Sequence, residues 1–272
     1  MRALLLLLLF DCYYVKSGFA QHLTGLTHAW ALGAYSAEQA DIFSFTANQA
    51  ALAASNRAGI AVGGERKFLI KELALYRFAA VITSRLGNFG LQGITRGFGD
   101  FRESRFGLAH ARQLGESAAI GLQFNYSSQT IAGYGSASAI SAELGVLLHL
   151  SGKLHTGFHI SNPGGGRSGS EFLEIPSVYT GGLGYDLSPA LLFTIEVTKE
   201  KTQPVDVMAG IQYMVIPTVL LRFAIQTALP SVLLGAGFCR NRWRLDLYTG
   251  YHPQLGSSAG ILLMSYFNRK TE

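Results

Sequence analysis

Residues 117–130 alternate strictly between large apolar and small or polar side chains, and this period of two constrains the fold more than any other feature. The large apolar positions are Ile120, Leu122, Phe124 and Tyr126, and the positions between them are Gly121, Gln123, Asn125 and Ser127. Successive side chains of a β-strand point to opposite faces. The segment is therefore predicted to be a strand with one apolar and one polar face. The same alternation recurs at 140–149, 191–198 and 219–226.

The polar face of these strands has a composition that is unusual for a soluble protein. Gly, Ser, Gln and Asn predominate with isolated charges, whereas a soluble sandwich presents mostly Lys, Glu, Thr and Asp to water. An apolar outer face and a crowded polar lumen are typical of a membrane barrel. The low charged fraction of 14% and the 32 glycines also favour many strands and turns in an apolar setting. We predict an all-β fold, a transmembrane up-and-down antiparallel β-barrel, with a soluble β-protein as the alternative.

About fourteen segments are strand candidates, which is within the range of outer-membrane barrels. They span residues 57–64, 68–83, 87–96, 104–113, 117–130, 139–150, 153–161, 176–187, 191–199, 205–215, 218–226, 231–239, 243–251 and 259–267. Short links such as 84–86 and 151–152 alternate with longer ones such as 97–103, 131–138 and 162–175. An even strand count places both ends of the barrel on the short-turn side, which is periplasmic in such barrels.

The two ends of the chain lie outside the strand pattern. Residues 1–20 are predicted to be a signal peptide, because Arg2 precedes an apolar run and small residues precede Gln21. Residues 21–56, rich in Ala and Gln, are predicted to form a short helix and loops. We call this segment the hatch, since it is expected to tuck into the barrel mouth; the alternative is a helix packed on a soluble domain. Residues 57–267 are the predicted barrel, and 268–272 a C-terminal tail.

Ionisable residues on the inward register of the predicted strands are the candidates for a functional lining. They are Arg77, Glu143, Glu196, Arg222 and Asp246. Because barrel lumens are ordinarily polar, one interpretation is a network of mutually satisfied charges that rigidifies a narrow barrel. The other is a polar lining that guides a ligand. We retain the five residues as pore-lining candidates.

Signals for catalysis, metals and nucleic acid are weak. His155 and His159 lie four residues apart on one predicted strand, a span of roughly 13 Å, so they cannot share one ion unaided, although His149 in the preceding strand keeps a metal site open as an alternative. No spacing of Ser, His and Asp residues indicates one catalytic site. The basic residues behind the formal charge of +5 are scattered rather than gathered on one face. We therefore expect no enzyme activity, no cofactor, no metal and no nucleic-acid partner.

Several short motifs carry a resemblance to a known family. They are Ala31-Leu32-Gly33-Ala34-Tyr35, Asp41, Asn48-Gln49-Ala50-Ala51-Leu52-Ala53, Phe106-Gly107-Leu108-Ala109 and Ile160-Ser161-Asn162-Pro163. In these motifs the chain resembles the FadL-type outer-membrane barrels, specifically the PorV/PorQ-like proteins of Bacteroidota. It departs from that pattern where Gln49 replaces Pro and Ala51 replaces Gly. The resemblance implies a barrel of about fourteen strands in the bacterial outer membrane, with an N-terminal hatch in which Asp41, Asn48 and Leu52 are the key positions.

The resemblance also implies a function. The PorV/PorQ-like branch predicts a non-catalytic barrel that acts as a partner or docking component of a type IX-like secretion or envelope-assembly complex. Its partners would be outer-membrane lipid and other envelope or secretion proteins. The alternative is a FadL-like channel for a small hydrophobic ligand, with the hatch as gate. A barrel hydrolase ranks third.

Overall fold

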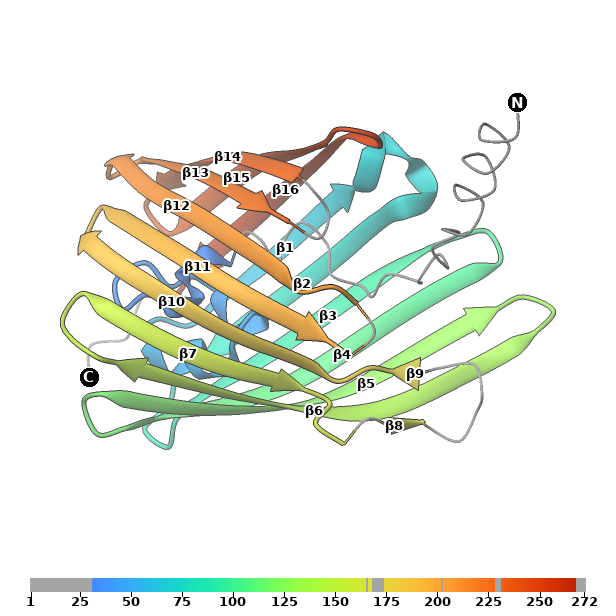
Figure 1. Ribbon diagram of the computed structural model, residues 1–272, viewed down its shortest axis with the longest axis horizontal. Helices are drawn as coiled ribbons and strands as arrows, with labels where there is room; N and C mark the ends of the chain where they lie inside the picture. The colour runs from blue at the N-terminus through green and yellow to red at the C-terminus, as the bar shows by residue number, and fades with distance from the viewer. Residues whose placement is uncertain (1–30, 165, 168–173, 202, 228–230, 268–272) are drawn as a thin grey trace, which may run out of the picture.

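The computed structural model describes residues 31–164, 166–167, 174–201, 203–227 and 231–267. The predicted signal peptide and C-terminal tail lie outside these residues, as does the first part of the hatch. The described chain forms a closed barrel of fourteen antiparallel strands, in which every strand pairs with its neighbours in chain order and β1 closes the barrel on β16 (Figure 1). The predicted all-β barrel of about fourteen strands is confirmed.

The barrel strands follow the predicted segments in order. They are β1 (Gly59–Arg66), β2 (Ala74–Ile82), β3 (Asn88–Phe98), β4 (Phe101–Leu114), β5 (Ala118–Ile131), β6 (Gly135–His149), β7 (Leu154–Ser161), β10 (Val178–Ser188), β11 (Leu191–Glu200), β12 (Asp206–Ile216), β13 (Val219–Gln226), β14 (Ser231–Arg240), β15 (Trp243–His252) and β16 (Gly256–Tyr266). Two short strands, β8 (Gly166–Arg167) and β9 (Glu174–Ile175), pair with each other between β7 and β10.

Strand boundaries differ most from the prediction on the long-loop side. The predicted loop 97–103 is largely strand, because β3 and β4 are joined only by Gly99 and Asp100, and Gly99 adopts a left-handed φ of 49° that allows a tight turn. Conversely, β2 begins at Ala74, since the preceding residues form two 3-10 turns, η5 (Lys67–Leu69) and η6 (Lys71–Leu73). Apolar periodicity does not reveal where a strand ends, because backbone hydrogen bonding between strands continues at the barrel rim with polar side chains.

The two faces of the wall have the chemistry that the alternation predicts. On β5 the outward side chains of Leu122 and Phe124 are 41% and 55% exposed, whereas the inward side chains of Gln123 and Asn125 are buried. Large apolar side chains thus cover the outside of the barrel, and small or polar ones predominate on the inside, together with some buried apolar ones such as Leu233 and Leu262. Among the described residues, no helix is long and apolar enough to cross a membrane.

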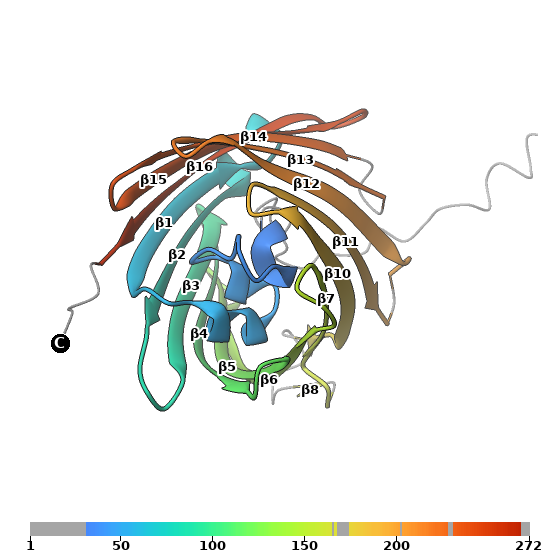
Figure 2. The ribbon, with the colours of Figure 1, turned by 90° about the vertical axis from the view of Figure 1, so that its left-hand side faces the viewer.

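The described part of the hatch, residues 31–56, lies inside the barrel (Figure 2). It consists of three 3-10 helices, η2 (Leu32–Tyr35), η3 (Ser44–Thr46) and η4 (Gln49–Ala54), joined by turns. Asn48 caps η4, since its side-chain oxygen accepts a hydrogen bond from the Ala50 N–H. The hatch occupies the half of the lumen that lies nearer the short turns (Figure 1). The floor of the lumen at this end is therefore filled by the chain's own N-terminal segment.

Candidate functional site

The candidate site is the interface between the hatch and the barrel wall. Inward-facing glycines form a part of the wall that the hatch touches, and we call the six on β5, β6, β7, β10 and β12 the glycine seat: Gly121, Gly145, Gly157, Gly182, Gly184 and Gly210. A Cβ atom at Gly145 would overlap the Asn48 side chain, and one at Gly182 would overlap the Tyr35 ring. The hatch backbone and side chains therefore lie directly against the strands.

A cluster of four buried charges joins the hatch to β13 and β15. The Asp41 carboxylate of the hatch lies 2.8 Å from Arg222 Nη2 and 3.5 Å from Arg244 Nη2. Asp246 binds the same two arginines, at 3.2 Å from Arg222 Nη1 and 2.7 Å from Arg244 Nη2. Two carboxylates and two guanidinium groups thus balance one another in a buried site, which is the condition under which buried ions are tolerated.

The electrostatic state of Asp41 follows from these neighbours. Burial by itself raises the pKa of the carboxyl, but the positive charges of Arg222 and Arg244 and the hydrogen bonds from Arg222 and the Phe43 N–H outweigh it. The pKa of Asp41 is therefore held below its ordinary value. Asp41 is ionised whenever the hatch is docked near neutral pH.

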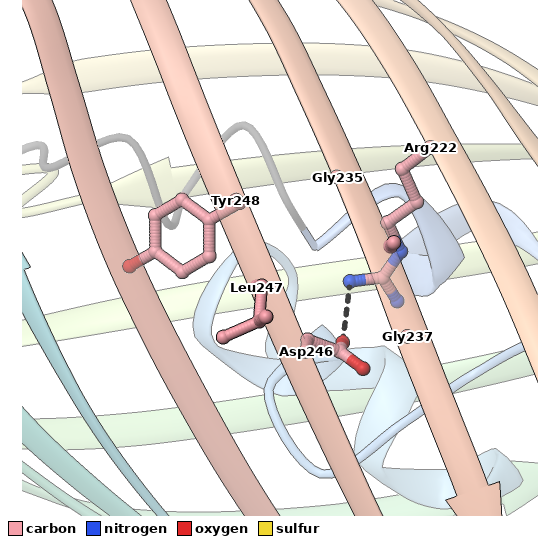
Figure 3. A pocket seen from close by; sticks show the side chains of 7 residues that line it. Arg222, Gly235, Gly237, Asp246, Leu247 and Tyr248 are labelled. Atoms are coloured by element: carbon pink, nitrogen blue, oxygen red, sulfur yellow. Dashed lines mark hydrogen bonds and ion pairs between the residues drawn. The ribbon is translucent and has the colours of Figure 1, made fainter.

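The cluster depends on a local feature of β14, which lies between β13 and β15. Arg222 on β13 and Asp246 on β15 point toward each other across β14 at Gly235 and Gly237 (Figure 3). An added Cβ at Gly237 would lie 2.5 Å from Asp246 Oδ1. The two glycines thus leave the space through which the ion pair crosses the intervening strand.

Amides extend the same network. Arg222 Nε donates to Gln212 Oε1 at 2.6 Å, and Gln212 Nε2 donates to Gln39 Oε1 of the hatch at 2.8 Å. Arg222 therefore contacts the hatch directly through Asp41 and indirectly through Gln39.

A second polar cluster joins the hatch to the opposite wall. Glu143 on β6 accepts hydrogen bonds from Gln49 Nε2 of the hatch at 2.5 Å and from Asn125 Nδ2 at 2.8 Å. His159 Nε2 on β7 lies 3.1 Å from the same carboxylate. Asn125 in turn accepts from Gln123 Nε2 at 2.7 Å. Two strand side chains and one hatch side chain thus bind a single buried carboxylate, and Gln123 holds one of them, Asn125, in place.

The third set of contacts holds η2 and the turn after it. Tyr35 Oη donates to Glu196 Oε2 on β11 at 2.9 Å, and burial together with the nearby Glu196 raises the pKa of the Tyr35 phenol well above its ordinary value. Ser36 Oγ donates to Asp186 Oδ1 on β10 at 2.7 Å. His155 Nε2 lies 3.0 Å from the other Asp186 oxygen. Hatch contacts are thus distributed around the barrel wall.

The five pore-lining candidates all face inward, but they do not form one site. Glu143, Glu196 and Arg222 bind the hatch directly, and Asp246 binds it through Arg222. Arg77 lies apart, with its Nη2 atom 3.8 Å from Glu65 Oε2 on the neighbouring strand. Whether these residues line a route for a ligand stays a prediction.

The three hatch candidates are all buried against the wall. Asp41 binds Arg222, and Asn48 Nδ2 donates to the Val146 carbonyl of β6 at 3.1 Å. Leu52 is buried in the apolar cluster of the lumen, and its carbonyl accepts a hydrogen bond from Asn88 Nδ2 at 2.9 Å. Each of them contacts the barrel wall, and that they are the key positions of the hatch stays a prediction.

Sequence reasoning did not select several residues of this interface, among them Tyr35, Asp186, Gln212 and Arg244. Asp186 and Arg244 share the inward register of their strands with Gly184 and Asp246, so the alternation could have revealed them. The hydrogen bond between Tyr35 and Glu196 joins residues that lie 161 positions apart in the sequence. No local pattern carries that information.

The histidines do not form the metal pair considered from the sequence. His159 binds Glu143, whereas His155 Nδ1 lies 2.8 Å from His149 Nδ1 across the β6–β7 hairpin. In the described part of the chain, no group of three or more His, Cys, Asp or Glu side chains is placed to hold a metal ion.

Comparison with known proteins identifies the fold. No protein-family model and no curated protein matches the sequence. Solved structures do match. The toluene transporter TbuX of Ralstonia pickettii matches at a TM-score of 0.67 and 10% sequence identity, over 84% of this chain and 94% of that one. The toluene transporter TodX of Pseudomonas putida has a TM-score of 0.59 and 10% identity over 86% of this chain and 96% of its own, and a FadL homologue of Pseudomonas aeruginosa has a TM-score of 0.56 and 10% identity over 82% and 93%. The chain is thus similar in fold to FadL-type outer-membrane barrels.

Proposed function

We propose that this protein is a FadL-like conduit that carries a small hydrophobic compound across the bacterial outer membrane, with the hatch as its gate. The observation that carries the proposal is a hatch held inside a fourteen-strand barrel of the same fold as two toluene transporters and a FadL homologue. The alternative function considered from the sequence thereby becomes the preferred one. The narrower PorV/PorQ-like assignment is not needed for this proposal.

Gating follows from the way the hatch is held. The hatch contacts three well-separated strands of the wall, β6, β11 and β13, through Glu143, Glu196 and Arg222. A compound that crosses this half of the lumen therefore requires the hatch to shift. Opening of the charge cluster around Asp41 frees the hatch from β13 and β15, and a shift of the whole hatch also breaks its hydrogen bonds to Glu143 and Glu196.

Uptake of a labelled aromatic hydrocarbon such as toluene tests the proposal. Intact cells that produce the full-length protein in their outer membrane are compared with cells that carry an empty vector. We expect faster uptake with the protein, and faster uptake still with Asp41→Asn, which weakens the hold on the hatch. Glu103→Gln is the matched control, because Glu103 binds Arg96 at 2.7 Å and makes no described contact with the hatch. Uptake equal to that of vector cells for both the unmodified protein and Asp41→Asn would refute a conduit.

A docking role in secretion or envelope assembly remains the second candidate, and one observation favours it. The links between β3 and β4, β5 and β6, and β15 and β16 are three residues or shorter, which leaves little material for a large extracellular ligand site. A docking protein should retain its partner after Glu196→Gln but lose it when residues 162–175 are shortened. Gentle detergent purification followed by mass spectrometry of co-purifying proteins distinguishes the two functions.

A further inference from the structure

The outer wall carries a groove over β12–β15, on the face opposite the charge cluster. Its volume is about 620 Å³, within the range of small-molecule sites in proteins. Bulky outward side chains form its walls, among them Leu221, Phe223, Leu234 and Leu247, each 41% to 51% exposed. Ala236 forms the floor, since it pairs with Leu221 on one side and Leu247 on the other and offers only a methyl group between them. The groove therefore runs over the small residues Gly235 and Ala236, between bulky, mostly apolar side chains of the neighbouring strands.

The same part of the barrel contains few acidic residues. From β12 to β16 the sequence contains two acidic residues, Asp206 at the long-loop end and the buried Asp246. The exposed charges at the short-turn end are Arg240 and Arg242, and no described acidic side chain pairs with either of them. Two neighbouring guanidinium groups without a protein counter-ion favour a negatively charged partner.

The arginines and the groove lie on the same strands at a matching separation. Ala236 and Arg240 both face outward on β14, four residues apart, which is roughly 13 Å along a strand. One leaflet contributes about half of the ~30 Å hydrocarbon core, so the groove lies at acyl-chain depth when the arginines lie at the headgroup level. Trp243 marks that level: it is 47% exposed, and the Arg242 guanidinium lies 5.8 Å from its ring centroid.

We propose that this surface is a binding site for one anionic glycerophospholipid of the leaflet on the short-turn side. An acyl chain fills the groove over Ala236, and the phosphate and the rest of the anionic headgroup bind Arg240 and Arg242. The guanidinium groups supply planar, bidentate donors to phosphate oxygens. Neither feature alone specifies a lipid, but an apolar groove at acyl-chain depth and an unpaired pair of arginines at headgroup depth fit the two parts of one molecule.

A second copy of the chain is the main competing occupant. The two arginines make it the less favourable one, because a symmetric contact over this surface would bring four guanidinium groups together with no acidic residue of this region to compensate them. A copy contact therefore requires the charges to be screened, whereas an anionic lipid neutralises them.

Native mass spectrometry of the full-length, delipidated protein tests the site. The protein is titrated with phosphatidylglycerol and, separately, with phosphatidylcholine, which shares its acyl chains and phosphate but carries no net charge. We expect one phosphatidylglycerol to bind with preference, and the double variant Arg240→Gln/Arg242→Gln to lose roughly tenfold or more of its affinity. Ala236→Leu, which fills the groove, should weaken binding of the same lipid.

Matched controls separate the site from general effects of charge and bulk. Arg85→Gln removes an exposed arginine elsewhere on the short-turn rim, and Ala80→Leu adds the same bulk at an outward alanine of β2 that pairs with Ile60 and Leu91. Both should bind phosphatidylglycerol as the unmodified protein does. Folding of each variant is checked by the difference in gel migration between unheated and boiled samples.

Three results would overturn the proposal. Equal affinity for the two lipids would contradict recognition of the headgroup charge by the arginines. Unchanged phosphatidylglycerol binding by both the double arginine variant and Ala236→Leu would show that the lipid does not bind at this surface. A cross-linked dimer that Ala236→Leu abolishes would assign the groove to a second copy. The rim arginines are exposed, so the double variant tests the proposal even where Ala236→Leu disturbs barrel assembly.

Discussion

Replacing Asp41 by Asn should release the hatch without unfolding the barrel. Asn keeps the volume of the side chain and can still accept the hydrogen bond from the Phe43 N–H, so the change removes one negative charge and little else. Arg222 and Arg244 then retain only Asp246 as counter-ion, and one positive charge remains buried without compensation. The hatch loses both of its ion pairs with this cluster, to Arg222 and to Arg244.

The magnitude follows from the cost of breaking a buried ion pair. Removing one partner destabilises by about 3–5 kcal/mol, and the lower end applies because Asp246 continues to bind both arginines. About 3 kcal/mol corresponds to a ~100-fold increase in the undocked population of the hatch. Hydrogen exchange of the amides of residues 43–54 measures this population directly, since undocking exposes them while the strand amides stay paired.

Two further variants test whether the effect arises from the unbalanced buried charge. Glu103→Gln breaks the Arg96–Glu103 pair far from the hatch and should leave exchange at 43–54 unchanged. Asp41→Asn/Arg222→Met removes one charge of each sign and should recover part of the protection, because neutral replacement of a buried pair costs less than leaving one ion alone. Equal hatch exchange in Asp41→Asn and the unmodified protein would refute a role of the Asp41 ion pairs in holding the hatch.

Three further predictions concern the same interface. Gly184→Leu should undock the hatch, because its side chain would occupy the position of the Tyr35 carbonyl, whereas Gly152→Ala in an open turn should not; hatch exchange and heat-modifiable gel migration measure the two effects separately. Tyr35→Phe should weaken docking by about 1.5–3 kcal/mol, measured in the same way, through loss of the buried hydrogen bond to Glu196; unchanged exchange would argue against that bond. The pKa of Asp41 is lower when the hatch is docked, so the ionised carboxylate stabilises the docked hatch. This stabilisation should be complete above the ordinary carboxyl pKa and should be lost as the pH falls below about 4. Asp41→Asn should remove this pH dependence.

The barrel could be predicted from the sequence because its main determinant is local. Alternation such as that of Gln123 and Asn125 with Leu122 and Phe124 fixes both the strand and the face of each side chain, whatever the rest of the chain does. The same register identified Glu143, Arg222 and Asp246 as inward residues. Strand ends such as Ala74 were less predictable, since pairing at a rim is set by turn geometry rather than by apolar pattern.

The contacts of the hatch could not be predicted in the same way. The partners of Asp41 are found 181 and 203 positions further along the chain, at Arg222 and Arg244, and nothing near Asp41 in sequence identifies them. The glycines at 145 and 182 were visible only as small residues on a polar face. Asn48 and Tyr35 of the hatch lie against them in the structure, so the glycines provide space for these side chains. A glycine in a sequence shows that space is needed but not which residue occupies it.

The closure of the barrel on itself has a consequence for biogenesis. β1 pairs with β16, so Gly59 meets Tyr266 and the seam forms only after nearly the whole chain has been made. The hatch precedes β1 in the chain, and its partner Arg244 lies on the last strand but one. The hatch thus depends on partners far along the chain, and such non-local pairing makes folding slow. We expect the final stage of assembly to enclose the hatch and seal the seam together, because the hatch contact with Arg244 and the pairing of β1 with β16 both need the last strands.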